Sequence, residues 1–277
     1  PRESIVKTLT SSGTSGQAVS KIFLDKQTAM LQTKVLSNIV SSIIGKKRAP
    51  MLIIDEPNVI SNRNNFSARG AGILGFSLFG TKREYALDEQ MELRVEPIQA
   101  FLQKHEGSRI FLFGFTFMIF QHFLRALEDL KINLDLSDAV LIHGGGWKKL
   151  IDQKIDSSQF RKRLYNFCGI NSVFDYYGMV EQTGSIHMEC EEGFLHAPVY
   201  GDVIVRRPRD FSCAEFGESG IIQTLSILPL SYPGHSLLTE DEGFIAGEDD
   251  CPCGRLGKYF KVTGRIKSSE IRGCSDT

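Results

Sequence analysis

The sequence predicts an α/β protein in which a parallel sheet flanked by helices is followed by a smaller β-rich subdomain. Over the first two thirds of the chain, short apolar runs typical of strands alternate with amphipathic stretches of helical length. This alternation is typical of a parallel sheet covered by helices. After Gly184 the pattern changes to short strand-like runs separated by Gly, Pro and acidic residues. We therefore expect an α/β core at residues 1–184 and a β-rich subdomain at residues 185–277.

Four helices are expected in the core from the spacing of apolar residues. They cover residues 25–44, 97–105, 116–130 and 159–167. Gly45 ends the first of them. The helix at 116–130 is apolar on most sides, so we expect it to be buried. Ser157 or Ser158 is expected to cap the last helix, because a hydroxyl oxygen can accept from a free N–H of the first turn.

Strands are expected between these helices and after them, where short apolar runs are flanked by turn residues. In the core they cover residues 51–54, 109–115, 139–142 and 172–177. In the β-rich part they cover residues 194–205, 220–228, 243–246 and 258–262. Ligands of parallel-sheet proteins bind beyond the carboxyl ends of the strands. The loops that follow residues 142 and 177 are therefore candidate binding loops.

Length, charge and cysteine content exclude several classes of protein. The 277 residues suffice for a full core in one large domain or two unequal domains. A net charge of -1 provides no basic field for nucleic acid or an anionic membrane. The longest strongly apolar run, residues 110–120, is too short to span a bilayer. Six cysteines in a chain of this length do not make a disulfide scaffold, so we expect a cytoplasmic protein.

A glycine- and hydroxyl-rich stretch at residues 10–17 precedes an apolar, β-prone run. Glycine lets the backbone approach a ligand closely, and successive N–H groups with hydroxyl donors can bind an anion. We interpret the stretch as a phosphate loop, with a solvated turn as the alternative. It is not a Walker A loop, because no Gly-Lys-Ser/Thr follows. The chain begins close to this motif, which predicts that an N-terminal part of the protein is missing. The candidate phosphate-binding residues are Ser12, Gly13, Thr14, Ser15 and Gly16.

The run Gly-Ala-Gly-Ile-Leu-Gly at residues 70–75 matches the glycine pattern of dinucleotide-binding proteins. That pattern requires a preceding strand, whereas residues 62–69 are polar and irregular. We therefore expect a tight loop or the start of a closely packed helix here.

Further motifs follow the glycine-hydroxyl stretch in a fixed order. They are His-Gly-Gly-Gly-Trp-Lys at 143–148, Tyr-Tyr-Gly-Met-Val-Glu at 176–181, Asp241 after Leu-Thr-Glu, and Gly-Arg at 264–265. This ordered set resembles the motifs of the adenylate-forming ligases. The segments 66–72, 113–118, 144–148, 229–235 and 272–277 are similar to the long-chain acyl-protein synthetases within that superfamily. Cys-Pro-Cys-Gly-Arg at 251–255 is more distantly similar to phenylacetate–CoA ligases.

The resemblance implies an enzyme that uses ATP and Mg²⁺ to convert a fatty acid into an acyl-adenylate, with release of pyrophosphate. The acyl group then passes to a protein cysteine thiol. Two anions must approach each other in the first step, so preorganised electrostatic stabilisation is needed. The implied roles are phosphate binding by residues 12–16, adenine-side contact by Gly144, Gly145 and Gly146, adenine stacking by Tyr177 beside Gly178, Mg²⁺ binding by Glu181, and ribose binding by Asp241.

The sequence departs from the typical adenylate-forming ligase after Gly264. That family has an aspartate or lysine hinge there and then a mobile domain with a catalytic lysine, whereas Lys267 matches the hinge only loosely. We therefore expect the C-terminal lid to be absent or truncated. The cation that serves the α-phosphate is left open among Lys21, Arg255 and Arg265. An acyl- or aryl-CoA ligase and a non-catalytic nucleotide-binding partner of an acyl-reductase complex are the alternative functions.

Four possible metal ligands occur in the β-rich part. Cys190 and His196 form a Cys-x5-His pair, and Cys251 and Cys253 form a Cys-x-Cys pair. Thiolate and imidazole suit a structural, tetrahedral Zn²⁺, and similar sets occur in some enzymes that resemble phenylacetate–CoA ligase. The Cys-x-Cys spacing is tighter than that of common zinc fingers, so reduced thiols without a metal are the alternative.

The resemblance also implies an acyl-accepting cysteine near the C-terminus. Cys274 is the fourth residue from the end, and Gly273 before it allows the chain to swing. Arg272 favours the reactive thiolate and Asp276 opposes it. A tail thiol without a role is the alternative. An acyl-CoA or acyl-protein reductase is the expected protein partner, and no nucleic-acid partner is expected.

Overall fold

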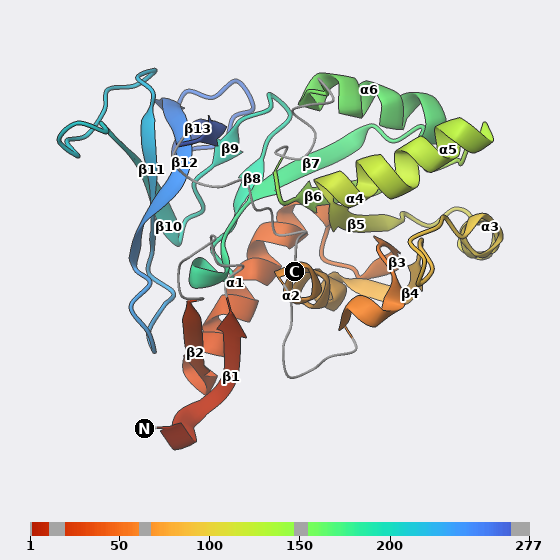
Figure 1. The fold of residues 1–277 in the computed structure, drawn as a ribbon, viewed down its shortest axis with the longest axis horizontal. Coiled ribbons are helices and arrows are strands. Elements are labelled where there is room, and N and C mark those ends of the chain that lie inside the picture. Colours follow the sequence, from red (N-terminus) through yellow and green to blue (C-terminus); the bar gives the residue numbers. More distant parts are fainter. Residues whose placement is uncertain (1, 11–19, 61–67, 147–154, 267–277) are drawn as a thin grey trace. The chain divides into compact units, whose positions relative to one another are not determined.

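The computed structural model describes residues 2–10, 20–60, 68–146 and 155–266 (Figure 1). Within these residues the chain forms two compact units. One unit contains the described residues of Pro1–Ile39 and Tyr176–Arg272, and the other contains those of Val40–Asp175.

The Val40–Asp175 unit is built on a parallel sheet. Its strands are β3 (Ala49–Ile54), β4 (Gly80–Tyr85), β5 (Phe111–Phe115), β6 (Val140–Gly144) and the first four residues of β7 (Ser172–Tyr177). Their order across the sheet is β7-β6-β5-β3-β4. The pairs β3–β4, β3–β5 and β5–β6 are all parallel. The expected parallel sheet is therefore confirmed.

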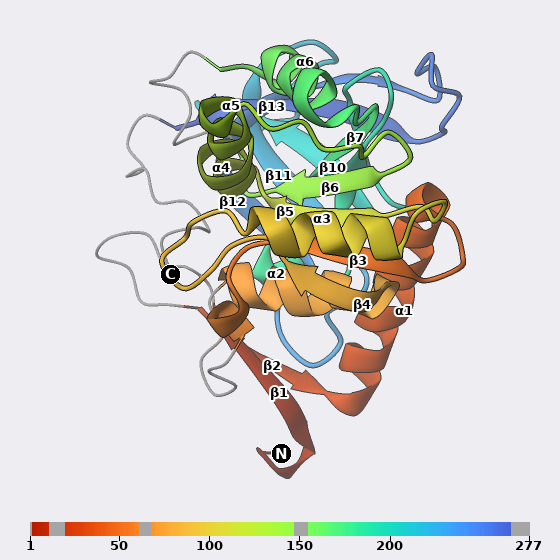
Figure 2. The ribbon, with the colours of Figure 1, turned by 90° about the vertical axis from the view of Figure 1, so that its right-hand side faces the viewer.

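Helices cover both faces of this sheet. They are α2 (Ala68–Phe76), α3 (Val95–Lys104), α4 (Thr116–Met118), η4 (Ile119–Leu124), α5 (Arg125–Leu130) and α6 (Ser157–Cys168). On one face, α3, the α4–η4–α5 segment and α6 pack on Leu112 and Leu141 (Figure 2). On the other face, Phe113 stacks on Phe76 of α2 with ring centroids 4.2 Å apart.

Helix predictions in this unit hold with two refinements. The segment 116–130 is helical and buried as expected, and its middle, η4, is a π-helical turn. The cap of α6 is Asp156 rather than Ser157 or Ser158, because the Asp156 carboxylate accepts from the Gln159 N–H at 2.8 Å. Residues 70–75 lie within α2, so the glycine pattern there belongs to a packed helix and not to a dinucleotide loop.

The other unit begins with an antiparallel two-stranded sheet, β1 (Ile5–Thr10) with β2 (Lys21–Asp25). Helix α1 (Lys26–Ile44) starts here, and Asp25 caps it by accepting from the Thr28 N–H at 2.8 Å. The short 3-10 turns of the chain are η1 (Arg2–Ser4), η2 (Pro57–Ile60), η3 (Ser77–Phe79) and η6 (Val180–Gln182).

An antiparallel sheet forms the rest of this unit. Its strands are β8 (His187–Glu189), β9 (Leu195–His196), β10 (Gly201–Arg206), β11 (Gly220–Ser226), β12 (Ser236–Glu248) and β13 (Lys258–Arg265). Their order is β10-β11-β12-β13-β9-β8, and the last two residues of β7 pair with β8. The strand expected at 194–205 is divided into β9 and β10 by a turn in which Gly201 N–H donates to Pro198 O.

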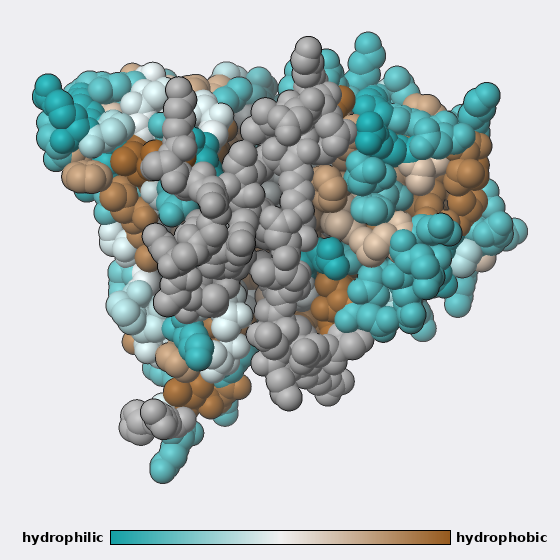
Figure 3. Space-filling view, in the orientation of Figure 1, coloured by the Kyte–Doolittle hydropathy of each residue, from teal (hydrophilic) through white to brown (hydrophobic). Residues whose placement is uncertain are grey.

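None of the described helices is long and apolar enough to cross a bilayer. In the orientation of Figure 3, hydrophilic residues predominate over the described surface of the Val40–Asp175 unit. The five cysteines among the described residues are all free thiols.

Candidate active site

The glycine loop at the end of β6 has a conformation that requires glycine. Gly145 and Gly146 have φ values of 90° and 70°, in the left-handed region that side chains disfavour. A Cβ on Gly145 would lie 2.5 Å from the Phe115 ring, which is closer than carbon atoms approach. At Gly146 the corresponding position is open space within the described structure. The loop backbone therefore packs directly on an aromatic ring at Gly145.

A buried polar network lies beneath this loop. The Thr116 hydroxyl donates to Gly144 O at 3.0 Å and lies 2.9 Å from His143 Nδ1. Burial, reinforced by the positive charge of Arg161, lowers the pKa of His143 to about 3. The imidazole is therefore neutral. Because the Thr116 hydroxyl donates its hydrogen to Gly144 O, its oxygen can only accept from the ring, so we assign the ring proton to Nδ1. Asp175 Oδ1 lies 3.6 Å from the same nitrogen.

A buried ion pair that the sequence analysis did not identify lies at the end of β3. Asp55 directly follows the strand and Arg69 is the second residue of α2. Arg69 Nε lies 3.2 Å from Asp55 Oδ2, and the Asp55 side chain is fully buried. Burial raises the pKa of Asp55 to about 6, against the opposing effect of the Arg69 charge. The two residues are 14 positions apart, so only the folded chain reveals the pair.

In the other unit, Tyr177, Asp241 and Arg265 are in contact. The Tyr177 hydroxyl donates to Asp241 Oδ2 at 2.8 Å, and Arg265 Nε lies 3.3 Å from Asp241 Oδ1. Burial and then the Asp241 charge raise the pKa of Tyr177 well above 10, so the phenol keeps its proton and remains a donor. Each carboxylate oxygen can accept a further hydrogen bond. The side chain of Asp241 is 17% exposed, which leaves it accessible to a ligand.

Glu181 lies in η6. Hydrogen bonds between this turn and residues that follow it in the chain hold the turn in place. The Tyr232 hydroxyl donates to Glu181 O at 2.8 Å. The buried Gln182 amide donates to Thr224 O and Gly234 O at 3.2 and 2.8 Å. Among the described residues, the Glu181 carboxylate makes no hydrogen bond or ion pair. The turn thus holds a half-buried carboxylate that is available to a cation, and Gly178 lies two residues before the turn begins.

The three candidate cations are separated. Arg265 contacts Asp241, and Lys21 is the exposed first residue of β2. Arg255 lies in the loop between β12 and β13, where it contacts Glu189 O and Glu191. Asp241 pairs with Arg265 at one end of β12–β13, and Glu248 pairs with Lys258 at the other. Seven residues of extended chain span about 23 Å, so Arg255 is remote from Asp241.

The four predicted metal ligands come together at that remote end of the hairpin. The ligand atoms of Cys190, His196, Cys251 and Cys253 all lie within 4.8 Å of one another. Cys190 Sγ is 4.0 Å from Cys251 Sγ, and Cys253 Sγ is 3.4 Å from His196 Nε2. A tetrahedral zinc with ordinary bond lengths separates two sulfurs by about 3.8 Å and a sulfur from a nitrogen by about 3.6 Å. The donor set and its spacing therefore fit zinc.

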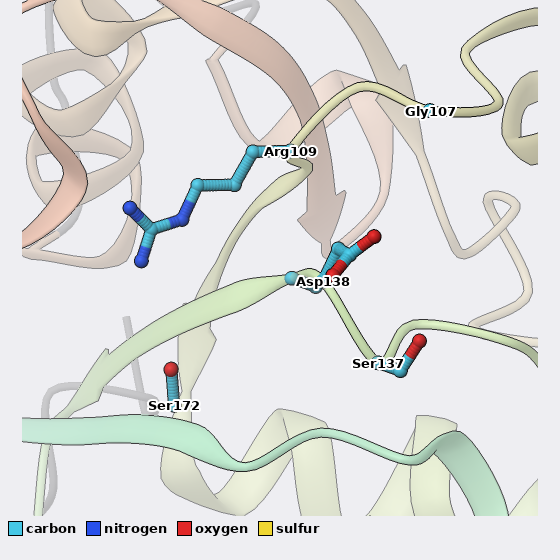
Figure 4. Close-up of a pocket in the computed structure, with 6 residues that line it drawn as sticks. Gly107, Arg109, Ser137, Asp138 and Ser172 are labelled. Atoms are coloured by element: carbon cyan, nitrogen blue, oxygen red, sulfur yellow. The ribbon is translucent and has the colours of Figure 1, made fainter.

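A surface cavity of about 410 Å³ occurs at the opposite edge of the parallel sheet from the glycine loop. Gly107, Arg109, Ser137, Asp138 and Ser172 line it, at the amino ends of β5, β6 and β7 (Figure 4). Ligands of parallel sheets bind at the carboxyl ends, so this polar cavity is not part of the candidate site.

Two of the predicted site elements lie outside the described residues. These are the phosphate loop, Ser12, Gly13, Thr14, Ser15 and Gly16, and the expected acyl acceptor Cys274. Trp147, Lys148 and Lys267 lie outside them as well.

Comparison with solved structures shows that the chain has the fold of adenylate-forming ligases. The ATP-bound MatB of Rhodopseudomonas palustris matches with a TM-score of 0.59 and 15% identity, over 96% of this chain and 49% of MatB. The long-chain-fatty-acid-CoA ligase FadD1 of Archaeoglobus fulgidus matches with a TM-score of 0.63 and 14% identity, over 96% and 52% of the two chains. The expected fold class is therefore confirmed.

Within this class the chain belongs to the LuxE family of acyl-protein synthetases, whose family model matches residues 2–277. A curated relative, the long-chain-fatty-acid–luciferin-component ligase of Vibrio harveyi, is 26% identical over 141 residues. This match covers 50% of the chain and 36% of the relative. The chain thus spans about a third of that relative and about half of the ligases matched by structure.

The contact between Gly145 and Phe115 predicts different costs for two neighbouring substitutions. Gly146→Ala adds only the strain of a left-handed alanine, about 1 kcal/mol. Gly145→Ala adds the same strain and a clash with the ring, so its loss in the free energy of unfolding should reach about 3 kcal/mol. Urea denaturation followed by circular dichroism measures both. Equal losses for the two variants would contradict the packing described here.

Proposed function

We propose that this chain uses ATP and Mg²⁺ to activate a long-chain fatty acid as its acyl-adenylate, and then transfers the acyl group to a protein cysteine thiol. Membership of the acyl-protein synthetase family supports the reaction. The name of the Vibrio harveyi relative supports a long-chain fatty acid as the acid. The observation that carries the proposal is the contact of Asp241 with both Tyr177 and Arg265, in the order of motifs that resembles this class.

The residues of this contact would act on the nucleotide through hydrogen bonds and charge. Asp241 accepts hydrogen bonds from the ribose hydroxyls, while Tyr177 and Arg265 hold its carboxylate in place. Arg265 is the candidate cation for the α-phosphate that lies beside Asp241, whereas Arg255 lies far along the hairpin. Lys21 remains a second candidate. In this proposal residues 12–16 bind the outer phosphates, and Gly144–Gly146 contact the adenine.

Glu181 would be the protein ligand of Mg²⁺. Carboxylate is a preferred ligand of this cation, which keeps several waters and binds phosphate oxygens as well. The bound cation neutralises negative charge on the phosphates, so that the fatty acid carboxylate can approach. Anchoring of η6 by Tyr232 and Gln182 fixes the backbone from which Glu181 projects. The proposal extends to a cytoplasmic location and to a reductase that receives the acyl group.

Substitution of Glu181 tests adenylation. Glu181→Ala should lower fatty-acid-dependent exchange of pyrophosphate into ATP by at least about 100-fold, because the cation loses its protein ligand. Glu106→Ala, at an exposed acid of the α3–β5 loop, is the matched control and should retain exchange. Near wild-type exchange in Glu181→Ala would remove Glu181 from the mechanism. Consumption of CoA in the wild-type reaction would favour an acyl-CoA ligase, and ATP binding without exchange would favour a non-catalytic protein.

We also propose that Cys190, His196, Cys251 and Cys253 bind one structural Zn²⁺. Their mutual distances support it, and burial raises the pKa of the Cys251 thiol to about 12, which a metal would offset by binding the thiolate. All four coordination positions are then filled by protein, as in structural sites. The metal would join β8 and β9 to the loop between β12 and β13.

Metal analysis of protein purified without chelator should give about one zinc per chain. Cys253→Ser should lose most of this zinc and lower the melting temperature by several degrees, since the metal stabilises only the folded chain. Cys213→Ser, at an exposed cysteine of the same unit, should leave both values unchanged. The proposal would be wrong if the wild-type protein contains no zinc and if added zinc leaves its melting temperature unchanged.

Cys274 is the proposed acyl acceptor on this chain. Incubation with ATP, Mg²⁺ and labelled fatty acid should give a protein adduct that hydroxylamine removes, as it does a thioester. Cys274→Ser should lose this adduct and keep pyrophosphate exchange, while Cys213→Ser should keep both. An undiminished hydroxylamine-sensitive label on Cys274→Ser would exclude Cys274 as the acceptor.

A further inference from the structure

The Asp55–Arg69 pair lies at the carboxyl edge of the parallel sheet, at the same level as the glycine loop. Asp55 directly follows β3, whose Ile54 pairs with Gly114 of β5. Gly114 in turn pairs with His143 of β6, and the next pair is Phe115 with Gly144. The ends of β3, β5 and β6 are therefore aligned. This edge is where ligands of parallel-sheet proteins bind.

Side-chain contacts connect Arg69 with the surroundings of the glycine loop. Arg69 Nη1 lies 3.7 Å from Met118 Sδ, in the first turn after β5. One turn along α2 from Arg69, Gly72 packs against the Phe115 ring, where a Cβ would lie 3.1 Å from the ring. The same ring covers Gly145. The helix that carries Arg69 and the glycine loop thus pack on the same aromatic ring within one compact unit.

The guanidinium forms an ion pair with Asp55 at Nε and contacts the Met118 thioether at Nη1. Asp55 Oδ2 faces Nε, and Asp55 Oδ1 accepts from the Glu56 N–H at 2.8 Å. Among the described residues, no second carboxylate lies within ion-pair distance of Arg69. Nη1 donates to the Met118 thioether, which is only a weak acceptor, and keeps a second N–H. Nη1 and Nη2 can therefore donate two parallel hydrogen bonds to a planar carboxylate. The Arg69 side chain is 18% exposed, so a ligand can reach it.

The charge and the surroundings of Arg69 select a type of anion. Asp55 already balances one positive charge, so the pair has little net charge with which to attract a polyphosphate. Met118, which contacts Arg69, is buried and apolar. His122 and Glu56 are among the titratable groups that interact with the charges of the pair. A monoanion with an apolar tail fits these surroundings better than a phosphate chain does. The pair is not explained by a gain in folding stability, because the cost of desolvating two charges offsets much of their attraction in a buried ion pair.

We propose that Arg69 binds the carboxylate of the fatty acid substrate through Nη1 and Nη2, and that Asp55 is a positioning residue that holds the guanidinium. This inference rests on the proposed acyl activation, to which it adds the binding group for the acid. In that step a carboxylate oxygen bonds to the α-phosphorus of ATP. The bond from that phosphorus to the bridging oxygen breaks, and pyrophosphate leaves with the electron pair. No proton, oxidant or reductant is consumed.

The test compares binding of tetradecanoate with binding of tetradecanol, which has the same chain without the carboxylate. Isothermal titration calorimetry without ATP measures both on the whole chain. Asp55→Asn/Arg69→Met removes the guanidinium without leaving a buried carboxylate unpaired. It should weaken tetradecanoate binding about 10- to 100-fold, since hydrogen bonds to a charged group are lost. Tetradecanol and ATP should bind as they do to the wild type.

Two further variants control for charge and folding. Arg69→Lys keeps the charge and the pairing with Asp55 but loses the planar fork, so it should weaken tetradecanoate binding less than the double variant does. Arg125→Met removes an exposed arginine of α5 in the same unit and should change nothing. Melting temperatures establish that each variant is folded. Tight tetradecanoate binding by the folded double variant, or an equal loss of tetradecanol binding, would overturn the inference, as would a wild type that binds no tetradecanoate.

Failure of the proposed function has a different signature. Carboxylate binding that depends on Arg69, without any exchange of pyrophosphate into ATP, would leave the Arg69 site in place and remove the ligase reaction. Active exchange whose KM for tetradecanoate is unchanged in the double variant would remove Arg69 and leave the ligase. The KM for ATP should be the same in all variants.

Discussion

The ring of Phe115 is the packing constraint on which the carboxyl edge of the parallel sheet depends. The ring occupies space next to residues 72 and 145, so α2 and the loop after β6 approach β5 closely only with glycine at both positions. The next residue, Thr116, bonds to Gly144 O and contacts His143. Two consecutive residues at the end of β5 therefore fix a helix and a loop together. Because protein interiors are close-packed, a change in one of these groups shifts the others.

The sequence predicted elements with a clear apolar pattern and missed those without one. The strands predicted at 51–54 and 172–177 correspond to β3 and β7. The first is wholly apolar, and the second is rich in Val, Phe and Tyr, which favour strands. Strand β4 was missed because Lys82, Arg83 and Glu84 make it polar, as suits a strand at the end of the sheet order. The apolar run at 243–246 marked only the middle of β12, whose earlier residues, Thr239 to Glu242, are polar and partly exposed.

The candidate site shows the same division between local pattern and tertiary contact. Motif order singled out Tyr177 and Asp241, which are 64 residues apart and share a hydrogen bond. Spacing and chemistry singled out four metal ligands that the fold brings together. Neither kind of reasoning paired Asp55 with Arg69. Arg69 lies in the similar segment 66–72, but its partner is known only when β3 and α2 place the two side chains 3.2 Å apart. Arg255 looked equivalent to Arg265 in sequence, and only the length of β12–β13 separates their surroundings.

The β12–β13 hairpin has Asp241 and Arg265 at one end and the cysteine loop, residues 251–253, at the other. Side chains alternate between the two faces of a strand, so a slip of one residue between β12 and β13 would turn Asp241 or Arg265 to the opposite face. Two interruptions of the pairing, at Glu242/Gly243 and Ile245/Gly247, lie between these residues and the cysteine loop. Each interruption shifts the pairing by one residue, so the loss of either one would change the alignment of Asp241 with Arg265. A chain whose cysteine loop is loose can therefore still fold, at a lowered melting temperature, and be misaligned at Asp241. Folded protein and correctly aligned protein are then two populations that a thermal assay alone does not separate.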